Sequence, residues 1–298
     1  MLPPALARAL SPRSWPFRLA LAVLGPRLPV IVIARVFRLP GGDLQRLIED
    51  RFLSALATFV TLVAITRLLE RRTLRETGLF ALPAIGRRLA AGLALGVFPV
   101  LGHGALLAAV GLYAFSWPGD GTLVETIGIA TVILVAAVDE EIRYRGLVFR
   151  ILDEGAGSWA AMAASGALFG LMHAGNAGAT PLGVVVVAAG GVMLAACYLL
   201  HRSLWIPIAF HFAWNTSMGA VLGLPISGVR IPALLRADAA GPDLWTGGRF
   251  GPEASLPVAV FVAVAATLIV WRVAAQGKLT RAPWGRAGAP PPADPSRR

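Results

Sequence analysis

Residues 182–200 read LGVVVVAAGGVMLAACYLL, an apolar run without a charged side chain. A helix needs about 20 such residues to cross the hydrocarbon core of a bilayer. Similar runs recur along the chain, so the predicted fold is all-α, a polytopic bundle of transmembrane helices. We expect about eight spans, near residues 19–37, 52–69, 89–115, 122–138, 157–173, 182–200, 204–222 and 256–271. The first is the weakest, because Pro26, Arg27 and Pro29 interrupt it, and it is expected to be broken or interfacial.

The composition supports a membrane protein. Hydrophobic residues make up 56% of the 298, charged residues 14%, and the mean hydropathy is +0.70, whereas soluble domains carry about 25% charged residues. The net charge of +11 is spread in short clusters between apolar runs, which argues against a nucleic-acid-binding domain. Cys197 is the single cysteine. A disulfide framework and a cysteine-based zinc site are therefore excluded, and Cys197 is expected to be a packing residue.

Positive charge alternates between the links that join the later spans. Arginine is concentrated in the links 70–88 and 143–150, at Arg202 and in the tail after 271. The links 116–121 and 174–181, which alternate with them, contain no Lys or Arg. By the positive-inside rule, the Arg-rich links and both termini are predicted to be cytoplasmic. The Ala-, Arg-, Gly- and Pro-rich composition is typical of a high-GC bacterium, so we expect a multi-pass protein of a bacterial inner membrane. The basic N-terminus is expected to be a retained anchor rather than a removed signal peptide.

A Glu pair lies at the cytoplasmic end of the fourth predicted span. Ionisable groups at membrane depth are costly and usually functional. On a helix, Glu141 and Arg145 are four residues apart and share a face, so they are expected to pair and to leave Glu140 free. An ordinary charge cluster at the lipid headgroups would explain these residues equally well if they stood alone.

Three further polar residues are candidates. His173 closes the fifth span, although a lone histidine there is more often structural than catalytic. His211 and Asn215 lie mid-span at i, i+4 and therefore on one helix face, where lipid offers no partner. Hydrogen bonding between helices is the alternative explanation for this pair. His201 is expected to be solvated and His103 to be a packing or hydrogen-bonding residue.

Together these side chains match what peptide hydrolysis requires, namely a water nucleophile, a base and donors for the developing oxyanion. Glu140 can serve as the base. His173 can orient the water or protonate the leaving amine, and His211 and Asn215 can donate to the oxyanion. The predicted spans place Glu140 and His173 at opposite ends of neighbouring helices, so convergence requires tilted, broken or deeply set helices, or different span limits.

The three motifs resemble the CPBP family of CAAX proteases and bacteriocin-processing enzymes, also called Abi or type II CAAX prenyl endopeptidases. The family pattern is Glu-Glu-x-x-x-Arg, Phe-x-x-x-His and His-x-x-x-Asn. Here it stands as Glu140 to Arg145, Phe169 to His173 and His211 to Asn215. The resemblance covers about residues 85–222. It divides the chain into N-terminal membrane segments (1–84), a catalytic helical core (85–222), an extracytoplasmic link with the last span (223–282) and a disordered cytoplasmic tail (283–298).

The resemblance implies a glutamic intramembrane endopeptidase with Glu140, His173, His211 and Asn215 as catalytic residues, supported by Glu141 and Arg145. No cofactor is expected, although a zinc metalloprotease using Glu140, His173 and His211 is an alternative. The expected partners are membrane lipid and a membrane-associated or lipidated protein substrate, and no nucleic acid. A non-catalytic scaffold or a transporter is the rival from another functional class.

Overall fold

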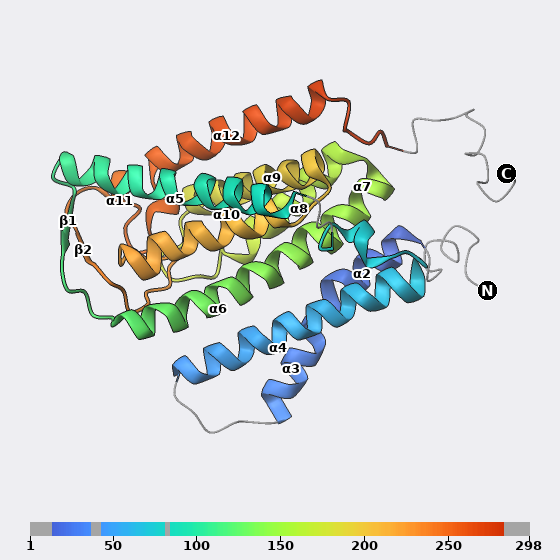
Figure 1. Ribbon diagram of the computed structural model, residues 1–298, viewed down its shortest axis with the longest axis horizontal. Coiled ribbons are helices and arrows are strands. Elements are labelled where there is room, and N and C mark those ends of the chain that lie inside the picture. The colour runs from blue at the N-terminus through green and yellow to red at the C-terminus, as the bar shows by residue number, and fades with distance from the viewer. Residues whose placement is uncertain (1–13, 37–42, 81–83, 283–298) are drawn as a thin grey trace, which may run out of the picture.

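The computed structural model describes residues 14–36, 43–80 and 84–282, and this part of the chain is mostly helical (Figure 1). The α-helices are α2 (Trp15–Leu24), α3 (Arg27–Val36), α4 (Asp43–Val63), α5 (Ile85–Ala109), α6 (Leu123–Glu141), α7 (Arg150–Ala156), α8 (Ser158–Met172), α9 (Pro181–His201), α10 (Trp205–Asn215), α11 (Asp243–Thr246) and α12 (Leu256–Ala275). Three π-helices, η1 (Ala64–Leu69), η3 (Ile142–Phe149) and η4 (Thr216–Val221), and two 3-10 helices, η2 (Leu74–Thr77) and η5 (Pro252–Ala254), extend or connect them. The strands are β1 (Tyr113–Ser116) and β2 (Arg236–Ala239).

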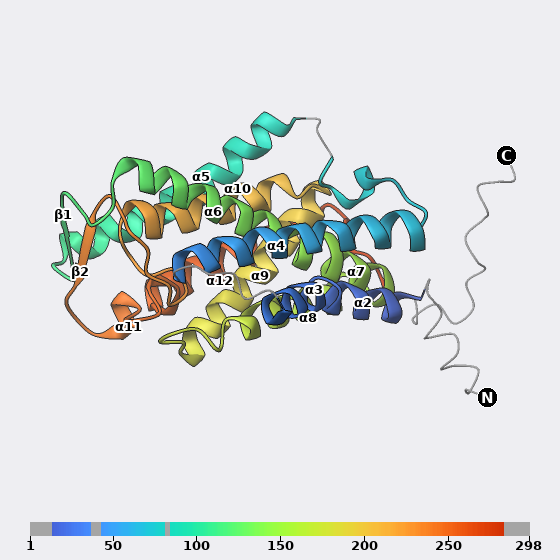
Figure 2. The same ribbon diagram turned by 90° about the horizontal axis from the view of Figure 1, so that it is seen from below.

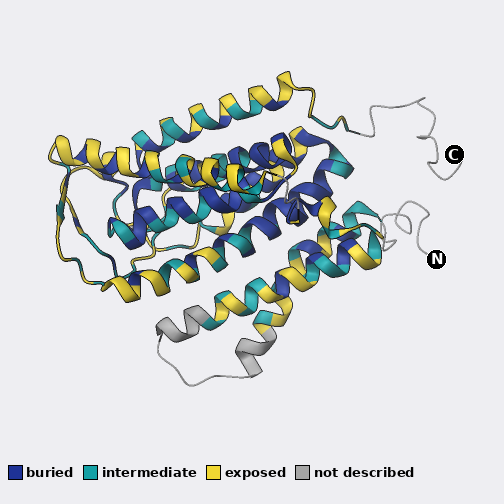
Figure 3. Ribbon diagram, in the orientation of Figure 1, coloured by how far each residue is buried: buried dark blue, intermediate teal, exposed yellow. Residues whose placement is uncertain are grey.

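Four helices in the described residues are long and apolar enough to cross a membrane: Glu49–Leu69, Ile85–Ala109, Pro181–His201 and Leu256–Ala275. In α12, Val258 and Val262 are buried, whereas Val260, Val264 and Leu268 are exposed (Figure 3). Apolar side chains on both faces are expected when one face of a helix packs on protein and the other on lipid. These helices indicate a multi-pass membrane protein.

The first predicted span is divided between α2 and α3. Each helix has ten residues and is therefore about 15 Å long, half the roughly 30 Å of a bilayer core. The chain turns at Gly25 and Pro26 between them. No single helix crosses the membrane within 19–36, as the interrupted sequence pattern indicated, and residue 37 lies outside the described residues.

The prediction that a charged link at 143–150 follows the fourth span is wrong. The helix runs without a break from Leu123 to Ala156 through α6, η3 and α7 (Figure 1). Glu141 and Arg145 are 0% and 1% exposed within it. Hydropathy ended the span near residue 138 because of its charges, but these charges are paired inside the bundle and the helix continues.

Small residues allow two helix pairs to approach closely. A Cβ at Gly166 or Gly170 of α8 would lie 2.8 or 2.6 Å from a carbonyl oxygen of α9. A Cβ at Gly92 or Gly96 of α5 would lie 2.6 Å from a carbonyl oxygen of α10. Close backbone approach at glycines is a usual way to pack helices in membranes. These contacts fix the positions of α8 and α10, which carry His173 and His211.

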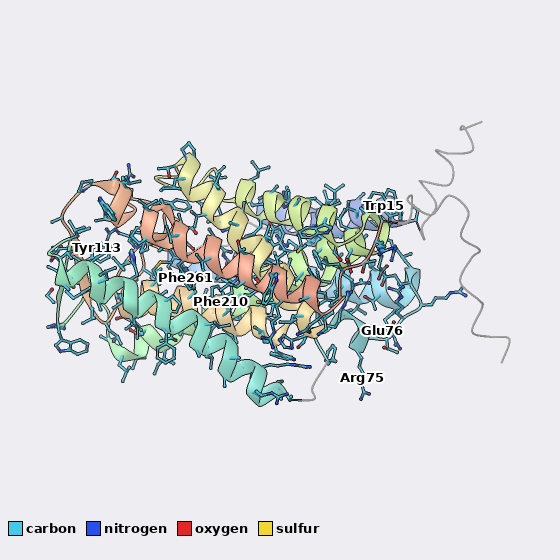
Figure 4. All side chains as sticks on the ribbon, turned by 90° about the horizontal axis from the view of Figure 1, so that it is seen from above. Trp15, Arg75, Glu76, Tyr113, Phe210 and Phe261 are labelled. Atoms are coloured by element: carbon cyan, nitrogen blue, oxygen red, sulfur yellow. The ribbon has the colours of Figure 1, made fainter. Side chains whose placement is uncertain are left out.

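A small antiparallel sheet caps one end of the bundle (Figure 1, left). It pairs Tyr113 with Ala239 and Ser116 with Arg236. Tyr113, labelled in Figure 4, donates its hydroxyl hydrogen to the Thr246 carbonyl oxygen at 2.7 Å. The all-α prediction is confirmed for the bundle, but it missed this sheet, because four-residue strands give too little alternation to be recognised.

Of the three buried apolar clusters in the described residues, two are large. One contains Phe149 and Tyr198, and the other contains Phe210 and Trp214. Phe210 and Trp214 stack at 5.6 Å between ring centroids, and Trp214 stacks on Phe261 of α12 at 5.9 Å (Figure 4). On another side of the bundle, α4 lies along α6 (Figure 2). The polar residues singled out in the sequence lie between these packed regions.

Candidate active site

Because α7 extends the helix beyond the Glu pair, the Glu pair and His173 lie at the same level along the bundle. Gly157, at the turn between α7 and α8, lies 16 residues after Glu141 and 16 before His173. Two antiparallel helices of equal rise per residue place such positions side by side. The expectation that Glu140 and His173 lie at opposite ends is therefore wrong, because η3 and α7 carry the chain several turns past the Glu pair before it returns.

A buried ion pair surrounds Glu141. Its Oε1 accepts hydrogen bonds from the Arg145 guanidinium at 2.8 Å and from His211 Nδ1 at 2.9 Å. Arg145 also donates to the Gly191 carbonyl oxygen at 3.2 Å, which ties η3 to α9. The predicted Glu141–Arg145 pair is confirmed. It forms although the backbone after Glu141 is π-helical, a feature common at functional sites.

Glu140 is paired more weakly and across the bundle. Its Oε1 lies 3.4 Å from an Arg51 nitrogen, and its Oε2 lies 3.8 Å from His211 Nε2. Oε2 is buried and has no hydrogen-bond partner within the described part of the chain. Glu140 is therefore free of Arg145, as predicted, but the sequence analysis missed its contact with Arg51.

Hydrogen bonds fix the protonation pattern of both motif histidines. His173 Nδ1 lies 2.8 Å from the Phe169 carbonyl oxygen, which can only accept, so Nδ1 carries hydrogen and a neutral ring has its lone pair on Nε2. Glu141 Oε1 already accepts a hydrogen bond from Arg145, so we assign His211 Nδ1 as a second donor to it. His211 Nε2 can then donate only if the ring is an imidazolium.

Phe169 forms the platform between these groups. Its ring lies 4.9 Å from that of His173 and 6.1 Å from that of His211, centroid to centroid. The Arg145 guanidinium carbon lies 4.6 Å from the Phe169 ring centroid, within the range of a cation–π contact. The motif phenylalanine therefore positions both histidines and the arginine.

Glu140, His173, His211 and Asn215 line one cavity of about 430 Å³. The cavity continues between α6, α9, α10 and α12, where its lining is mainly apolar and includes Val186, Met193, Leu194, Phe210, Trp214, Val258 and Val262. All four residues predicted as catalytic thus line the same space, although Glu140 comes from α6, His173 from the residue that follows α8, and His211 and Asn215 from α10.

The lining of this cavity also includes a polar group that the sequence analysis missed. Ser227 donates from its backbone N–H to Glu253 at 2.8 Å, and Asn176 donates to the Ser227 carbonyl oxygen at 2.9 Å. These residues lie in links whose sequences gave no periodic signal. The residues given a structural role behave as expected: Cys197 is buried and free, His201 is exposed, and His103 packs on Tyr113 at 5.8 Å between centroids.

Among the described side chains of residues 14–31, 49–80 and 84–282, no three His, Cys, Asp or Glu are grouped as a candidate metal site. Glu140, His173 and His211 share the cavity. The contact of His211 Nδ1 with Glu141 leaves its Nε2 as the nitrogen that faces Glu140, an arrangement that histidines bound to metals also use. The zinc alternative therefore stays open and is tested below.

Comparison with known proteins gave one family match. Residues 122–217 match the family described as Rce1-like, type II CAAX prenyl endopeptidase Rce1-like. The matched segment contains all three motifs and runs from the start of α6 to the beginning of η4. The resemblance to the CAAX protease family is thereby confirmed. A comparison with curated proteins found no match.

Proposed function

With residues 122–217 belonging to the CAAX protease family, we propose that the protein is an intramembrane endopeptidase that hydrolyses peptide bonds of membrane-associated or lipidated proteins. The observation that carries the proposal is the unpartnered, buried Oε2 of Glu140 in a cavity that His173, His211 and Asn215 also line. A carboxylate oxygen without a hydrogen-bond donor retains its lone pairs for a proton. Glu140 is therefore the base.

The reaction follows from the protonation pattern. A water in the cavity gives one proton to Glu140 Oε2 as its oxygen attacks the peptide carbonyl carbon, and the lone pair of His173 Nε2 orients it. The resulting oxyanion accepts hydrogen bonds from the Asn215 amide and from His211 as an imidazolium. The proton held by Glu140 then passes to the leaving nitrogen, and the C–N bond breaks. An apolar cavity strengthens these interactions because little solvent screens them.

The arrangement of charge supports an orientation. Arg71 and Arg75 lie in the segment joining η1 to α5, Arg87 lies in the first turn of α5, and Arg202 follows α9. The segment before α5 and the C-terminal end of α9 lie at the end of the bundle opposite the sheet (Figure 1). This end is cytoplasmic by the positive-inside rule. In this topology both termini are cytoplasmic and the chain makes eight passes, the first formed by α2 and α3 together.

The proposal is tested by cleavage of a membrane-anchored reporter protein by the purified protein in liposomes. Glu140→Gln is expected to lower the rate by about 10²–10⁴, the usual contribution of a general base. The matched control is Glu154→Gln, which alters a glutamate on the same continuous helix away from the cavity. Equal activity of Glu140→Gln and wild type would refute the assignment. Binding of the reporter without cleavage would favour the scaffold alternative.

The same assay separates metal-dependent from glutamate-driven hydrolysis. Because the proposed reaction uses Glu140 as the base and no metal ion, activity is expected to survive a strong chelator, and elemental analysis is expected to find no stoichiometric zinc. Loss of activity on chelation with recovery on adding zinc would favour a metalloprotease.

A further inference from the structure

Arg51 reaches the cavity from outside the matched segment. It lies in the part of α4 that is fixed to α6: Ser54 donates to Asp139 at 2.7 Å, and Arg143 donates to Ser54 at 2.7 Å and to Thr58 at 3.0 Å. These bonds lie within two turns of Arg51. Helix α4 therefore presents the guanidinium to the cavity from a fixed backbone position.

Arg51 places a guanidinium in this cavity. Of the described residues that line the cavity, it is the one Arg or Lys. Its contact with Glu140 is long, at 3.4 Å through a single nitrogen, and its side chain is 39% exposed. A guanidinium is suited to binding a carboxylate through two nitrogens, so this contact leaves most of its donor capacity unused.

The other two glutamates that line the cavity, Glu125 and Glu253, make no hydrogen bond or ion pair with Arg51. Glu125 lies 15 residues before Glu140 on α6, which corresponds to about 22 Å along the helix axis. Glu253 is occupied by the backbone N–H and hydroxyl of Ser227. Among the described residues that line the cavity, Glu140 is therefore the one acidic residue in contact with Arg51.

We propose that Arg51 binds a carboxylate of the substrate and exchanges it for Glu140, so that the base is released when a correct substrate is seated. The proposal rests on the endopeptidase function above and adds a specificity determinant to it. Exchange of one carboxylate for another conserves the charge pairing of the guanidinium. The substrate carboxylate comes either from the C-terminus of the peptide or from an acidic side chain.

A binding measurement tests this proposal independently of peptide cleavage. The probe is a fluorescent peptide with an aliphatic C-terminal segment, presented in detergent micelles as the free acid, as the C-terminal amide, and as the amide with one internal glutamate. Wild type is expected to bind a carboxylate form about tenfold more tightly than the plain amide, as for one charge-assisted hydrogen-bonded contact. The form that is preferred identifies the source of the carboxylate.

Variants attribute the preference to Arg51. Arg51→Met is expected to abolish it without weakening binding of the plain amide, and Arg51→Lys to restore it in part. The matched control is Arg67→Met, which removes an exposed arginine outside the cavity and should retain the full preference. In Glu140→Gln, the carboxylate peptide is expected to bind more tightly than in wild type, because Arg51 no longer has an anionic partner.

Two results would overturn the proposal: equal binding of acid and amide forms by wild type, or a preference that persists in Arg51→Met. If the preference follows Arg51 but no variant or wild type cleaves any peptide, the endopeptidase function fails while the carboxylate site stands. If wild type cleaves, Arg51→Met should raise KM for the carboxylate peptide and leave KM for the amide unchanged.

Discussion

Two clusters of charged residues differ in how their carboxylate oxygens are hydrogen-bonded. The α7 network comprises Arg18, Glu70, Arg150 and Glu154, and joins α2 and η1 to α7. Both oxygens of Glu70 are occupied there, by Arg18 at 2.5 Å and by Arg150 at 2.8 Å. At the cavity, Oε2 of Glu140 and Oε2 of Glu141 are buried without a hydrogen-bond partner in the described residues.

The difference separates stabilisation from chemistry. A carboxylate that accepts donors on both oxygens holds helices together and has no accessible lone pair for a proton. A buried carboxylate oxygen without a donor is unfavourable for folding, and such groups are concentrated at functional sites. The α7 network therefore stabilises the fold. The cluster at the cavity keeps carboxylate oxygens that are unfavourable for folding, and we attribute them to the proposed catalytic role of Glu140.

Removal of Arg145 should have the largest effect on stability. Arg145→Ala leaves Glu141 as a buried charge that keeps only His211, and breaking a buried pair in this way costs about 3–5 kcal/mol. Thermal unfolding in detergent should show a marked fall in Tm, accompanied by loss of activity through displaced geometry. Arg67→Ala, at an exposed position, serves as control. An unchanged Tm for Arg145→Ala would contradict the role assigned to this pair.

Breaking the α7 network should lower stability without changing the chemistry. In Glu70→Gln, an amide replaces the charge between Arg18 and Arg150, and about 1.5–3 kcal/mol should be lost, as for hydrogen bonds to a charged group. The cleavage rate per folded molecule should equal that of wild type. If the rate of the folded fraction fell in parallel with Tm, the two clusters would not be functionally separate.

The surface turn η2 provides a smaller, pH-dependent effect. The backbone N–H and hydroxyl of Thr73 hold the pKa of Glu76 below its ordinary value of 4.5. A lowered folded-state pKa adds stability above the unfolded pKa, and this stability is lost as the pH falls through the folded value. Glu76→Gln should therefore cost less than about 1 kcal/mol at neutral pH, because the side chain is exposed and screened. The difference from wild type should vanish in acid, and a difference that grew on acidification would contradict this origin.

Glu140→Gln should have the smallest effect on stability. The substitution removes a buried charge whose Oε2 has no hydrogen-bond donor. The free energy of unfolding should therefore fall by no more than about 0.5 kcal/mol, or should rise. Differential scanning fluorimetry of Glu140→Gln beside Glu70→Gln measures the contrast directly. If both variants were destabilised to the same extent, the carboxylate of Glu140 would be structural, and its place as the base would be lost.

The sequence by itself determined that this is a helical membrane protein with three polar motifs. Apolar runs of about 20 residues require helices in lipid, because the backbone must satisfy its own hydrogen bonds. Helical spacing alone also identified Glu141 as the partner of Arg145, since side chains four residues apart share a face irrespective of the rest of the fold.

Only the tertiary structure decided the depth and the surroundings of these motifs. Hydropathy ended the fourth span before Glu140, because it scores each charge as if it faced lipid or water. The structure buries Glu141, Arg145 and Arg150 against partners from other helices, so the helix continues to Ala156. That extension places His173 level with Glu141.

Arg51, Asn176 and Glu253 could not be assigned to the site from the sequence. They lie more than 30 residues from their nearest motif or in irregular links, and no local period connects them to it. Their approach to the cavity depends on how α4, the α8–α9 turn and the 223–255 link pack on the bundle. Periodicity therefore determines which side chains share a face of one helix, whereas packing between helices determines which of them meet in one cavity.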